Sequence, residues 1–475
     1  MRLRGRLARG VMPVLVTLAL VSASLAGCTT VVAGTASSGI APTAPDAQLD
    51  IVGDGGTSFD RLAKNALTDV EAFWTTQYPL VSDGESLEKL EGSIYSVDDA
   101  HPGAEIRSNA CVKKVGVRVI KNNAMFCQLD DSIIYDRAGY IPGLVKKYGD
   151  YMVAAMFAHE FGHAVQDRLG TINALDSIVA ESQADCAAGA FTSWVLHFKA
   201  PHVRVTPAAL DRVLAGYIQL RDTEPHDASD EGTHGNGFDR VGAFAEGVND
   251  GVKACYSDDW EDRKFTERAY TSDADYASGG DVPEAEVLQA AAPQSSDGET
   301  LIQNLNKFWS HAASTINKPW HDVSIVVNDA ADSNDNPPCA PATTSQFVYC
   351  PAQNKIYYGQ NLADAAYEDG DFSLGTLLAF GWGLAVRSQL FGRSLDDAPA
   401  LLAAACYTGA YAESVNVDSP AAGQNFVLSP QDMDEATISV LSVVAGSDAL
   451  GARGTTGLMR ITAFNKGYFG GLSVC

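Results

Sequence analysis

The pattern of apolar residues between 151 and 169 predicts a buried helix. This stretch, YMVAAMFAHEFGHAVQDRL, contains no proline, and apolar residues lie on both sides of its few polar positions. Residues 173–198, NALDSIVAESQADCAAGAFTSWVLHF, are also small and apolar and predict a second helix that returns along the first. The short segment SIIYD at 132–136 predicts a strand. We therefore expect an α+β fold that is mostly helical.

The N-terminus has the pattern of an export signal. Arginines precede an apolar run that is short for a transmembrane helix and ends in small residues. Its ending, LAGC, resembles a bacterial lipobox, which implies a signal peptide at 1–27 and a diacylated Cys28; an ordinary signal peptide with a chance cysteine is the alternative. The lipid would tether the chain to the cell membrane, on its extracytoplasmic side. Residues 28–56 are small and flexible and predict a linker.

The sequence also repeats itself. EAFWTTQYP near 71 pairs with NKFWSHAAS near 306, and the helical segment 144–166 pairs with 364–387. Three further pairs keep the same order along the chain. We therefore predict two tandem copies of one fold, at 57–270 and 297–475, joined by an acidic linker of small residues at 271–296. One large domain with coincidental similarity is the alternative.

The cysteines agree with two copies. Eight remain after Cys28, four in each copy, and an even set in an exported protein favours disulfides. Each copy allows three connectivities, with free thiols or zinc ligation as alternatives. We predict the pairs Cys111–Cys127, Cys186–Cys255, Cys339–Cys350 and Cys406–Cys475.

Charge narrows the classes of partner. The formal net charge is −26, and the removed signal would carry only basic charges. A polyanion of this size argues against nucleic acid or anionic lipid headgroups as partners.

The first predicted helix contains the pattern HExxH, which is typical of zinc sites. His159 and His163 project from one face, one turn apart, and can bind one Zn²⁺ while leaving coordination positions open. Glu160 lies about 100° around the helix and can reach a metal-bound water instead of the metal. Without a metal, burying these polar groups would be costly. Core histidines satisfied by backbone groups are the alternative.

The second predicted helix supplies the missing ligand. Glu181 and Asp185 lie one turn apart on the same face. We expect Glu181 to bind the zinc and Asp185 to hydrogen-bond a ligand imidazole, which would fix its tautomer. A solvated helix face is the alternative.

Here the chain resembles a known family. AHEFGHAVQ, ESQADCAAGAF and THGNGFDRVGAFAEGVNDG are similar to segments of the bacterial neutral zinc metallopeptidases, and the similarity is good over 125–255. The resemblance implies a gluzincin-like, zincin-type domain that hydrolyses a peptide or protein substrate. It assigns one Zn²⁺ to His159, His163 and Glu181, with Glu160 as the general base.

The same resemblance gives a role to His234. A histidine at this position would stabilise the oxyanion of a tetrahedral intermediate; a solvent loop is the alternative. Tyr135 and Tyr151 are weaker candidates. We expect the strand at 132–136 to be an edge strand beside the first predicted helix, where it could pair with an extended peptide. The acidic loop 221–232 would gate access or disfavour acidic peptides, and a flexible insertion is the alternative that we favour.

The second copy lacks the whole site. The residues aligned with His159, Glu160, His163, Glu181 and Asp185 are Phe380, Gly381, Leu384, Leu401 and Ala405, and the position of His234 falls near Gly454. The fold therefore does not need these polar groups. We predict a degenerate pseudo-peptidase repeat that binds substrate, covers the cleft or contacts a protein partner. The sequence as a whole predicts a lipid-anchored zinc peptidase, with a non-catalytic zinc-binding interaction or scaffold lipoprotein as the alternative.

Overall fold

The computed structural model describes most of the chain after residue 41. The described residues are 42–98, 100–222, 227–230, 232–270, 272, 276, 280–289, 299–328, 337–339, 347–416, 427–442 and 454–475. Within these ranges, no helix combines the length and the apolar character that a bilayer span requires. The signal peptide and Cys28 predicted from the sequence lie outside the described residues.

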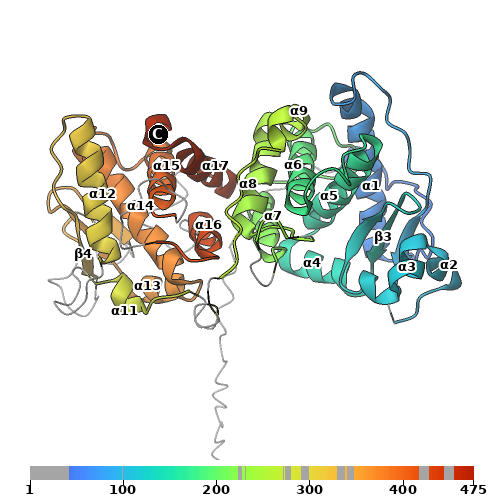
Figure 1. The fold of residues 1–475 in the computed structure, drawn as a ribbon, viewed down its shortest axis with the longest axis horizontal. Coiled ribbons are helices and arrows are strands. Elements are labelled where there is room, and N and C mark those ends of the chain that lie inside the picture. Colours follow the sequence, from blue (N-terminus) through green and yellow to red (C-terminus); the bar gives the residue numbers. More distant parts are fainter. Residues whose placement is uncertain are drawn as a thin grey trace, which may run out of the picture. The chain divides into compact units, whose positions relative to one another are not determined.

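The described residues up to 270, here called the first half, are mostly helical (Figure 1). Its strands are β1 (Ile94–Val97), β2 (Ala124–Cys127) and β3 (Ser132–Asp136). Its helices are α1 (Ser58–Gln77), α2 (Ala104–Ser108), α3 (Ala110–Val115), α4 (Tyr140–Tyr148), α5 (Tyr151–Arg168), α6 (Ser177–Leu196), α7 (Pro207–Gln219), α8 (Gly237–Asp250) and α9 (Val252–Cys255). Short 3-10 turns are η1 (Tyr78–Leu80), η2 (Val117–Ile120) and η3 (Asp258–Trp260).

The described residues from 280 onward form the second half. Its strands are β4 (Ser324–Val327), β5 (Phe347–Cys350) and β6 (Lys355–Tyr358). Its helices are α11 (Glu284–Val287), α12 (Leu301–Thr315), α13 (Gln360–Tyr367), α14 (Asp371–Gln389), α15 (Ala398–Ser414), α16 (Asp432–Ser442) and α17 (Gly457–Gly470), followed by the 3-10 turn η4 (Leu472–Val474). The fold is therefore α+β and mostly helical, as the sequence predicts.

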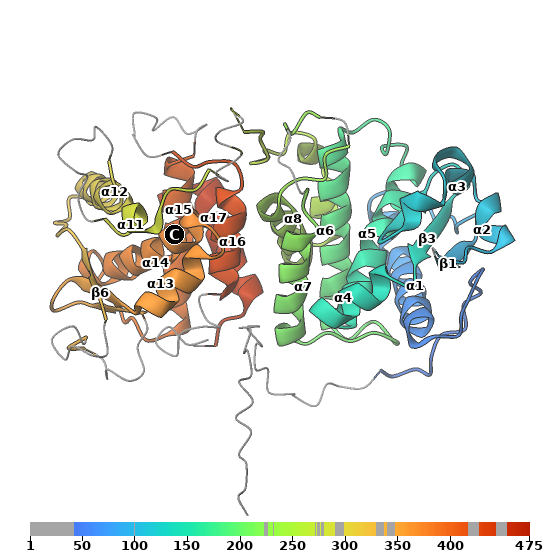
Figure 2. The ribbon, with the colours of Figure 1, turned by 90° about the horizontal axis from the view of Figure 1, so that it is seen from below.

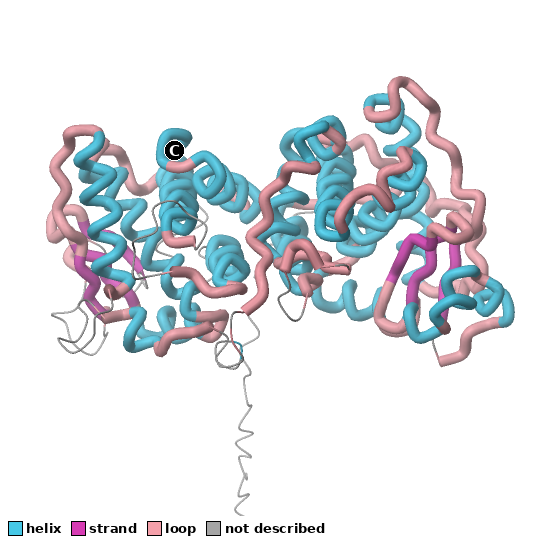
Figure 3. The backbone as a smooth tube through the Cα atoms, viewed as in Figure 1, coloured by secondary structure: helices cyan, strands magenta, loops and turns pink. Residues whose placement is uncertain are grey.

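Each half contains one small mixed sheet, drawn in magenta in Figure 3. The strand orders are β1-β3-β2 and β4-β6-β5, and in both sheets the first pair is parallel and the second antiparallel. The segment 132–136 is a strand, but β3 lies between β1 and β2. Its prediction as an edge strand is therefore wrong, because both of its edges are already paired. The edge strand next to α5 is β2.

Corresponding helices begin and break in the same way in both halves. The first long helix of each half starts with a capping box, from Thr57 in α1 and from Thr300 in α12. The segment 144–166, predicted as part of one helix, is divided at Gly149, and its counterpart is divided at Gly370. Both glycines have positive φ, 88° and 119°, which a residue with a side chain rarely adopts.

Two helix pairs approach closely enough to require glycine. A Cβ on Gly189 of α6 would lie 2.0 Å from the carbonyl oxygen of Phe244 in α8. A Cβ on Gly409 of α15 would lie equally close to that of Phe464 in α17. Disulfides lie close by: Cys186–Cys255 ties α6 to α9, which follows α8, and Cys406–Cys475 ties α15 to the residue after η4, which follows α17. All four predicted disulfides are confirmed, namely Cys111–Cys127, Cys186–Cys255, Cys339–Cys350 and Cys406–Cys475.

The segments predicted as linkers pack onto the halves where the structure describes them. Ala47 and Ile51 are buried, and Val52 forms a parallel bridge with Tyr95 of β1. In the other segment, the backbone of Val282 donates to Asp371 and accepts from the Tyr367 hydroxyl. In their described parts, 42–56 and 280–289 thus belong to the folded protein.

The helices α7 and α8 pack against α16 and α17 of the second half (Figure 2). Phe238, near the start of α8, contacts the rings of Phe464, Tyr468 and Phe469 in α17, with its centroid 5.0 Å from that of Tyr468. These contacts bury the Phe238 ring against α17, although Phe469 itself stays exposed.

Candidate metal centre

The buried helix α5 brings two imidazoles together. His159 and His163 stand one turn apart on the same side of the helix, and their Nε2 atoms are 3.2 Å apart. The helix packs against α1, α6 and β2, so both imidazole rings are largely shielded from bulk solvent. His159 retains only 8% of its exposure.

Glu181 of α6 completes a group of three. Its Oε2 atom lies 3.2 Å from Nε2 of His159, and its Oε1 atom lies 3.4 Å from Nε2 of His163. The spacing that suggested a returning helix therefore places this carboxylate against both rings, as predicted. The three side chains form a group that could hold a metal ion.

The hydrogen bonds of the imidazoles are compatible with metal binding. Nδ1 of His159 lies 2.7 Å from Oδ1 of Asp185, and Nδ1 of His163 lies 2.8 Å from Oε1 of Gln166. Because both partners are acceptors, each Nδ1 carries the ring proton. In the neutral rings, the Nε2 atoms therefore turn lone pairs toward each other and toward the Glu181 carboxylate. The repulsion among these three acceptors is relieved either by a bound cation or by protonation of an imidazole.

The distances and donor types fit zinc. A tetrahedral zinc ion with ligands at about 2.0–2.1 Å separates its ligand atoms by about 3.3 Å, close to the separations among these three side chains. Two imidazoles and one carboxylate are also a common zinc ligand set that leaves a position open. The described residues contain one other group of potential ligands, Asp281, Asp371 and Glu435, but it offers only carboxylates.

The electrostatics of the group favour positive charge. Burial lowers the pKa of His159, but Asp185 and Glu181 outweigh it and raise this pKa to about 10. For His163, burial opposes the charge, and Glu181 is the main reason that the pKa is raised. Burial favours the neutral form of Glu181, yet the two histidines hold its pKa well below the usual range.

A chain of buried amides orients His163, and no pattern in the sequence indicates it. The amide nitrogen of Gln166 donates to the Ala180 carbonyl at 2.7 Å and to Oε1 of Gln183 at 3.0 Å. Gln183 in turn donates to the carbonyl of Cys255 at 3.1 Å. These donations leave the oxygen of Gln166 as the acceptor for His163. Only the packing of α6 against α5 and α9 reveals this role.

Asp185 supports His159 from the other side, as expected. Its fully buried carboxylate also receives Nε and Nη2 of Arg240 from α8, at 2.8 and 3.0 Å. Burial raises the pKa of Asp185, but Arg240 and His159 outweigh it, so this pKa is lowered. The structure therefore gives Arg240 a direct role in holding Asp185.

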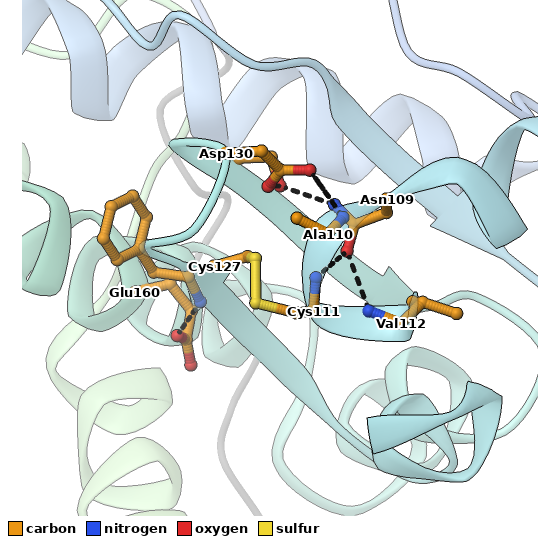
Figure 4. Close-up of a disulfide and its surroundings, with 9 residues drawn as sticks. Asn109, Ala110, Cys111, Val112, Cys127, Asp130 and Glu160 are labelled. Atoms are coloured by element: carbon orange, nitrogen blue, oxygen red, sulfur yellow. Dashed lines mark hydrogen bonds between the residues drawn. A yellow bond between two sulfur atoms is a disulfide. The ribbon is translucent and has the colours of Figure 1, made fainter. Parts of the chain in front are cut away.

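Glu160 lies beside the three candidate metal ligands and is not one of them. Its Oε2 atom accepts the backbone N–H of Phe126 in β2 at 2.9 Å, next to the Cys111–Cys127 disulfide (Figure 4). Burial is the main reason that the pKa of Glu160 is raised, although the two histidines oppose this shift. The edge strand therefore fixes the direction of the carboxylate.

A pocket of about 490 Å³ opens over this group. Its wall includes the metal-ligand side chains, Glu160, residues 122–126 and His234. Asp222 holds His234, with Oδ2 accepting its backbone N–H at 2.7 Å and Oδ1 lying 3.0 Å from its Nδ1. This bond is the first cause of the raised pKa of His234, and its ring remains 52% exposed. His234 thus lines the same pocket as Glu160, and Asp222 is a partner that the sequence did not indicate.

The two tyrosine candidates lie elsewhere. Tyr135 is buried and bonds Asp60, and Tyr151 bonds Thr192, so neither lines the pocket. Tyr140 and Tyr217 line it instead. The buried hydroxyl of Tyr217 has no hydrogen-bond partner among the described residues. The acidic loop 221–232 is described only in part, so its gating role stays a prediction.

In the second half, apolar residues occupy the positions that align with the candidate metal site. Phe380, Leu384, Leu401 and Ala405 are buried in the apolar core. A Cβ on Gly381, the residue aligned with Glu160, would lie 2.4 Å from Ile356 in β6 and 3.0 Å from Phe347 in β5. Apolar side chains of the sheet therefore fill the space that the Glu160 side chain occupies in the first half.

Comparisons of the chain with protein-family models, curated proteins and solved structures found no match.

Proposed function

We propose that this protein is an extracytoplasmic zinc-dependent peptidase that hydrolyses peptide bonds in its first half. The observation that carries the proposal is the position of Glu160. A structural zinc site needs its ligands, but it does not need a second buried carboxylate beside an open coordination position. Here Glu160 faces the same pocket as His159, His163 and Glu181 without belonging to their group.

The residues of the chain divide the chemistry among them. Zinc, when bound, acidifies a water molecule and polarises the scissile carbonyl. Glu160, aimed by the N–H of Phe126, takes the proton of that water and delivers it to the leaving amine. Asp222 favours the charged form of His234, whose Nε2 then donates a hydrogen bond to the oxyanion.

The edge strand β2 offers a way to hold the substrate. Residues 124–126 line the pocket, and their outer edge is not paired with another strand of the sheet. An extended peptide can add to such an edge through backbone hydrogen bonds, which give affinity with little demand on sequence. The β2 edge of the pocket therefore favours a protein or peptide as the substrate.

The decisive test compares wild type with Glu160→Gln. Both are expected to contain one zinc by elemental analysis, but only wild type should digest casein or a peptide library. Glu85→Gln, the same change at an exposed position, is the matched control and should remain active. Equal cleavage by Glu160→Gln would defeat the mechanism. Zinc in both proteins without cleavage by wild type would favour the alternative, a non-catalytic zinc-binding interaction or scaffold lipoprotein.

The location follows from the disulfides and the N-terminus. Four disulfides indicate an extracytoplasmic protein. We propose that a lipid on Cys28 anchors it to the cell membrane. Cys28→Ser should then release the protein from the membrane fraction, and a variant that stays membrane-bound would contradict the anchor.

We also propose that the second half is a degenerate copy of the peptidase fold. The matching strand orders, helix breaks and close glycine contacts support this proposal, and the apolar filling around Gly381 supports the loss of activity. The predicted boundaries, 57–270 and 297–475, would then separate a catalytic from a non-catalytic copy.

A further inference from the structure

Asp434 of α16 reaches from the second half to the first turn of α8. Its Oδ1 atom accepts the N–H of Phe238 at 2.8 Å, and the N–H of Gly237 also donates to this carboxylate. Its Oδ2 atom forms an ion pair with Nε of Arg221 at 3.1 Å. The side chain is only 1% exposed. A carboxylate from the second half thus satisfies free amides at the positive end of α8.

The reverse contact also exists. Asp211 of α7 accepts the N–H of Gly457 at 2.9 Å, and the N–H of Leu458 donates to it as well, at the first turn of α17. Each aspartate is the last residue of a similar six-residue segment, TPAALD for Asp211 and SPQDMD for Asp434. The contact between the halves is therefore reciprocal, like the interface of a two-fold symmetric dimer.

The two capped helices differ in what their arginine residues contact. In α8, the capped turn leads directly to Arg240, which holds Asp185, and Asp185 holds the ring of His159. In α17, the corresponding Arg460 donates to two backbone carbonyls of α16. Only the cap from Asp434 therefore stands in a chain of contacts that ends on a metal ligand.

The same aspartate also fixes the pocket wall. Arg221, its ion-pair partner, lines the pocket. The next residue, Asp222, holds His234 over the site. Loss of Asp434 would free both the start of α8 and the segment that carries Asp222.

We propose that Asp434 is a positioning residue through which the second half sets the geometry of the metal centre in the first half. The proposal rests on the proposed function in one respect, that His159, His163 and Glu181 bind zinc. The non-catalytic copy then acts as a permanent partner, because its carboxylate holds α8, and with it Arg240 and Asp185, in place.

The test uses the full chain and the matched pair Asp434→Ala and Asp211→Ala. Each variant removes one of two equivalent caps at the same interface, so both should lower the midpoint of chemical denaturation. Zinc affinity is measured by competition with a chromophoric chelator. Asp434→Ala should weaken zinc binding about 10-fold or more, the range found for residues that orient metal ligands, while Asp211→Ala should leave it within about twofold of wild type.

The conservative variant Asp434→Asn separates the two contacts of the carboxylate. Its amide oxygen can still accept the N–H of Phe238, but the charge that pairs with Arg221 is gone. We expect it to keep near-normal zinc affinity and to lower kcat more than it raises KM, because Arg221 precedes Asp222, which holds His234. This kinetic split decides the question if Asp434→Ala does not fold. Equal zinc affinity and equal kinetics in folded Asp434 and Asp211 variants would overturn the inference. A wild type that binds no zinc would overturn the proposed function itself.

Discussion

Nδ1 of His163 lies 2.8 Å from the side-chain oxygen of Gln166, three residues further along the same helix. The amide group of Gln166 cannot turn around, because its nitrogen already donates to Ala180 and Gln183. Gln166 therefore keeps the proton of His163 on Nδ1 and the lone pair of Nε2 toward the metal position.

Replacing Gln166 by leucine should weaken zinc binding. The ring of His163 would lose its acceptor and its fixed tautomer, so we expect zinc affinity to fall about 10- to 100-fold. Chelator competition measures this change. Gln128→Leu, the same substitution at an exposed residue, is the control and should bind zinc normally. Unchanged affinity in a folded Gln166→Leu protein would show that the amide chain has no influence on the site.

Replacing His234 by alanine should slow catalysis without removing the metal. Loss of one oxyanion donor typically costs about 100- to 1,000-fold in kcat, and His234 is not among the metal ligands. Zinc content and peptide cleavage are measured on the same sample. His101→Ala, at a ring that is 84% exposed, serves as the control. If His234→Ala retained full kcat, the oxyanion would have to be stabilised by another group.

The contact between α6 and α8 should tolerate no side chain at Gly247. A Cβ there would lie 1.8 Å from the backbone carbonyl oxygen of Cys186, which cannot move without shifting α6. We expect Gly247→Ala to destabilise the protein by at least about 1–3 kcal/mol, the usual cost of overpacking a core. Denaturant midpoints measure the loss. Gly143→Ala in α4, where a Cβ meets nothing within 4 Å, should instead be neutral or stabilising by about 0.5–1 kcal/mol. Equal midpoints for the two variants would contradict the close approach.

Asp239 should make the stability of the protein depend on pH. Burial raises the pKa of this residue to about 7, although the N–H groups of Thr266 and Glu267 oppose the shift. Between its ordinary value near 4 and pH 7, the folded protein keeps a proton that the unfolded chain releases. The contribution of Asp239 to stability is therefore present below pH 4 and is lost as the pH rises to 7.

The measurement is the change in unfolding free energy between pH 4.5 and 7.5, compared between wild type and Asp239→Asn. The variant should lose stability less steeply over this window, by a few kcal/mol, because one pKa unit corresponds to about 1.36 kcal/mol. Asp262→Asn, at an exposed position, should follow wild type. An identical slope in Asp239→Asn would mean that the carboxylate is already charged in the folded protein.

The spacing of residues along the sequence was sufficient to predict the candidate metal-binding group. His159 and His163 share a helix face because they are four residues apart. The short connection between α5 and α6 favours packing of α6 alongside α5, which brings Glu181 and Asp185 near the two histidines. The disulfides were predictable for a similar reason, since each half repeats the same pattern of four cysteines. The strand at 132–136 was also correct, but its place in the sheet was not, because β-pairing partners come from distant parts of the chain.

By itself, the sequence determined which residues could bind a metal, because helical periodicity depends only on nearby residues. It also indicated two similar halves, because similar segments recur in the same order along the chain. Only the tertiary structure decided what holds those residues. Gln166 reaches Gln183 across two helices, Arg240 reaches Asp185 from α8, and Asp434 reaches α8 from the second half. These contacts join residues up to 196 positions apart, and their partners are chosen by the packing of buried polar groups, each of which must find a hydrogen-bond partner away from water.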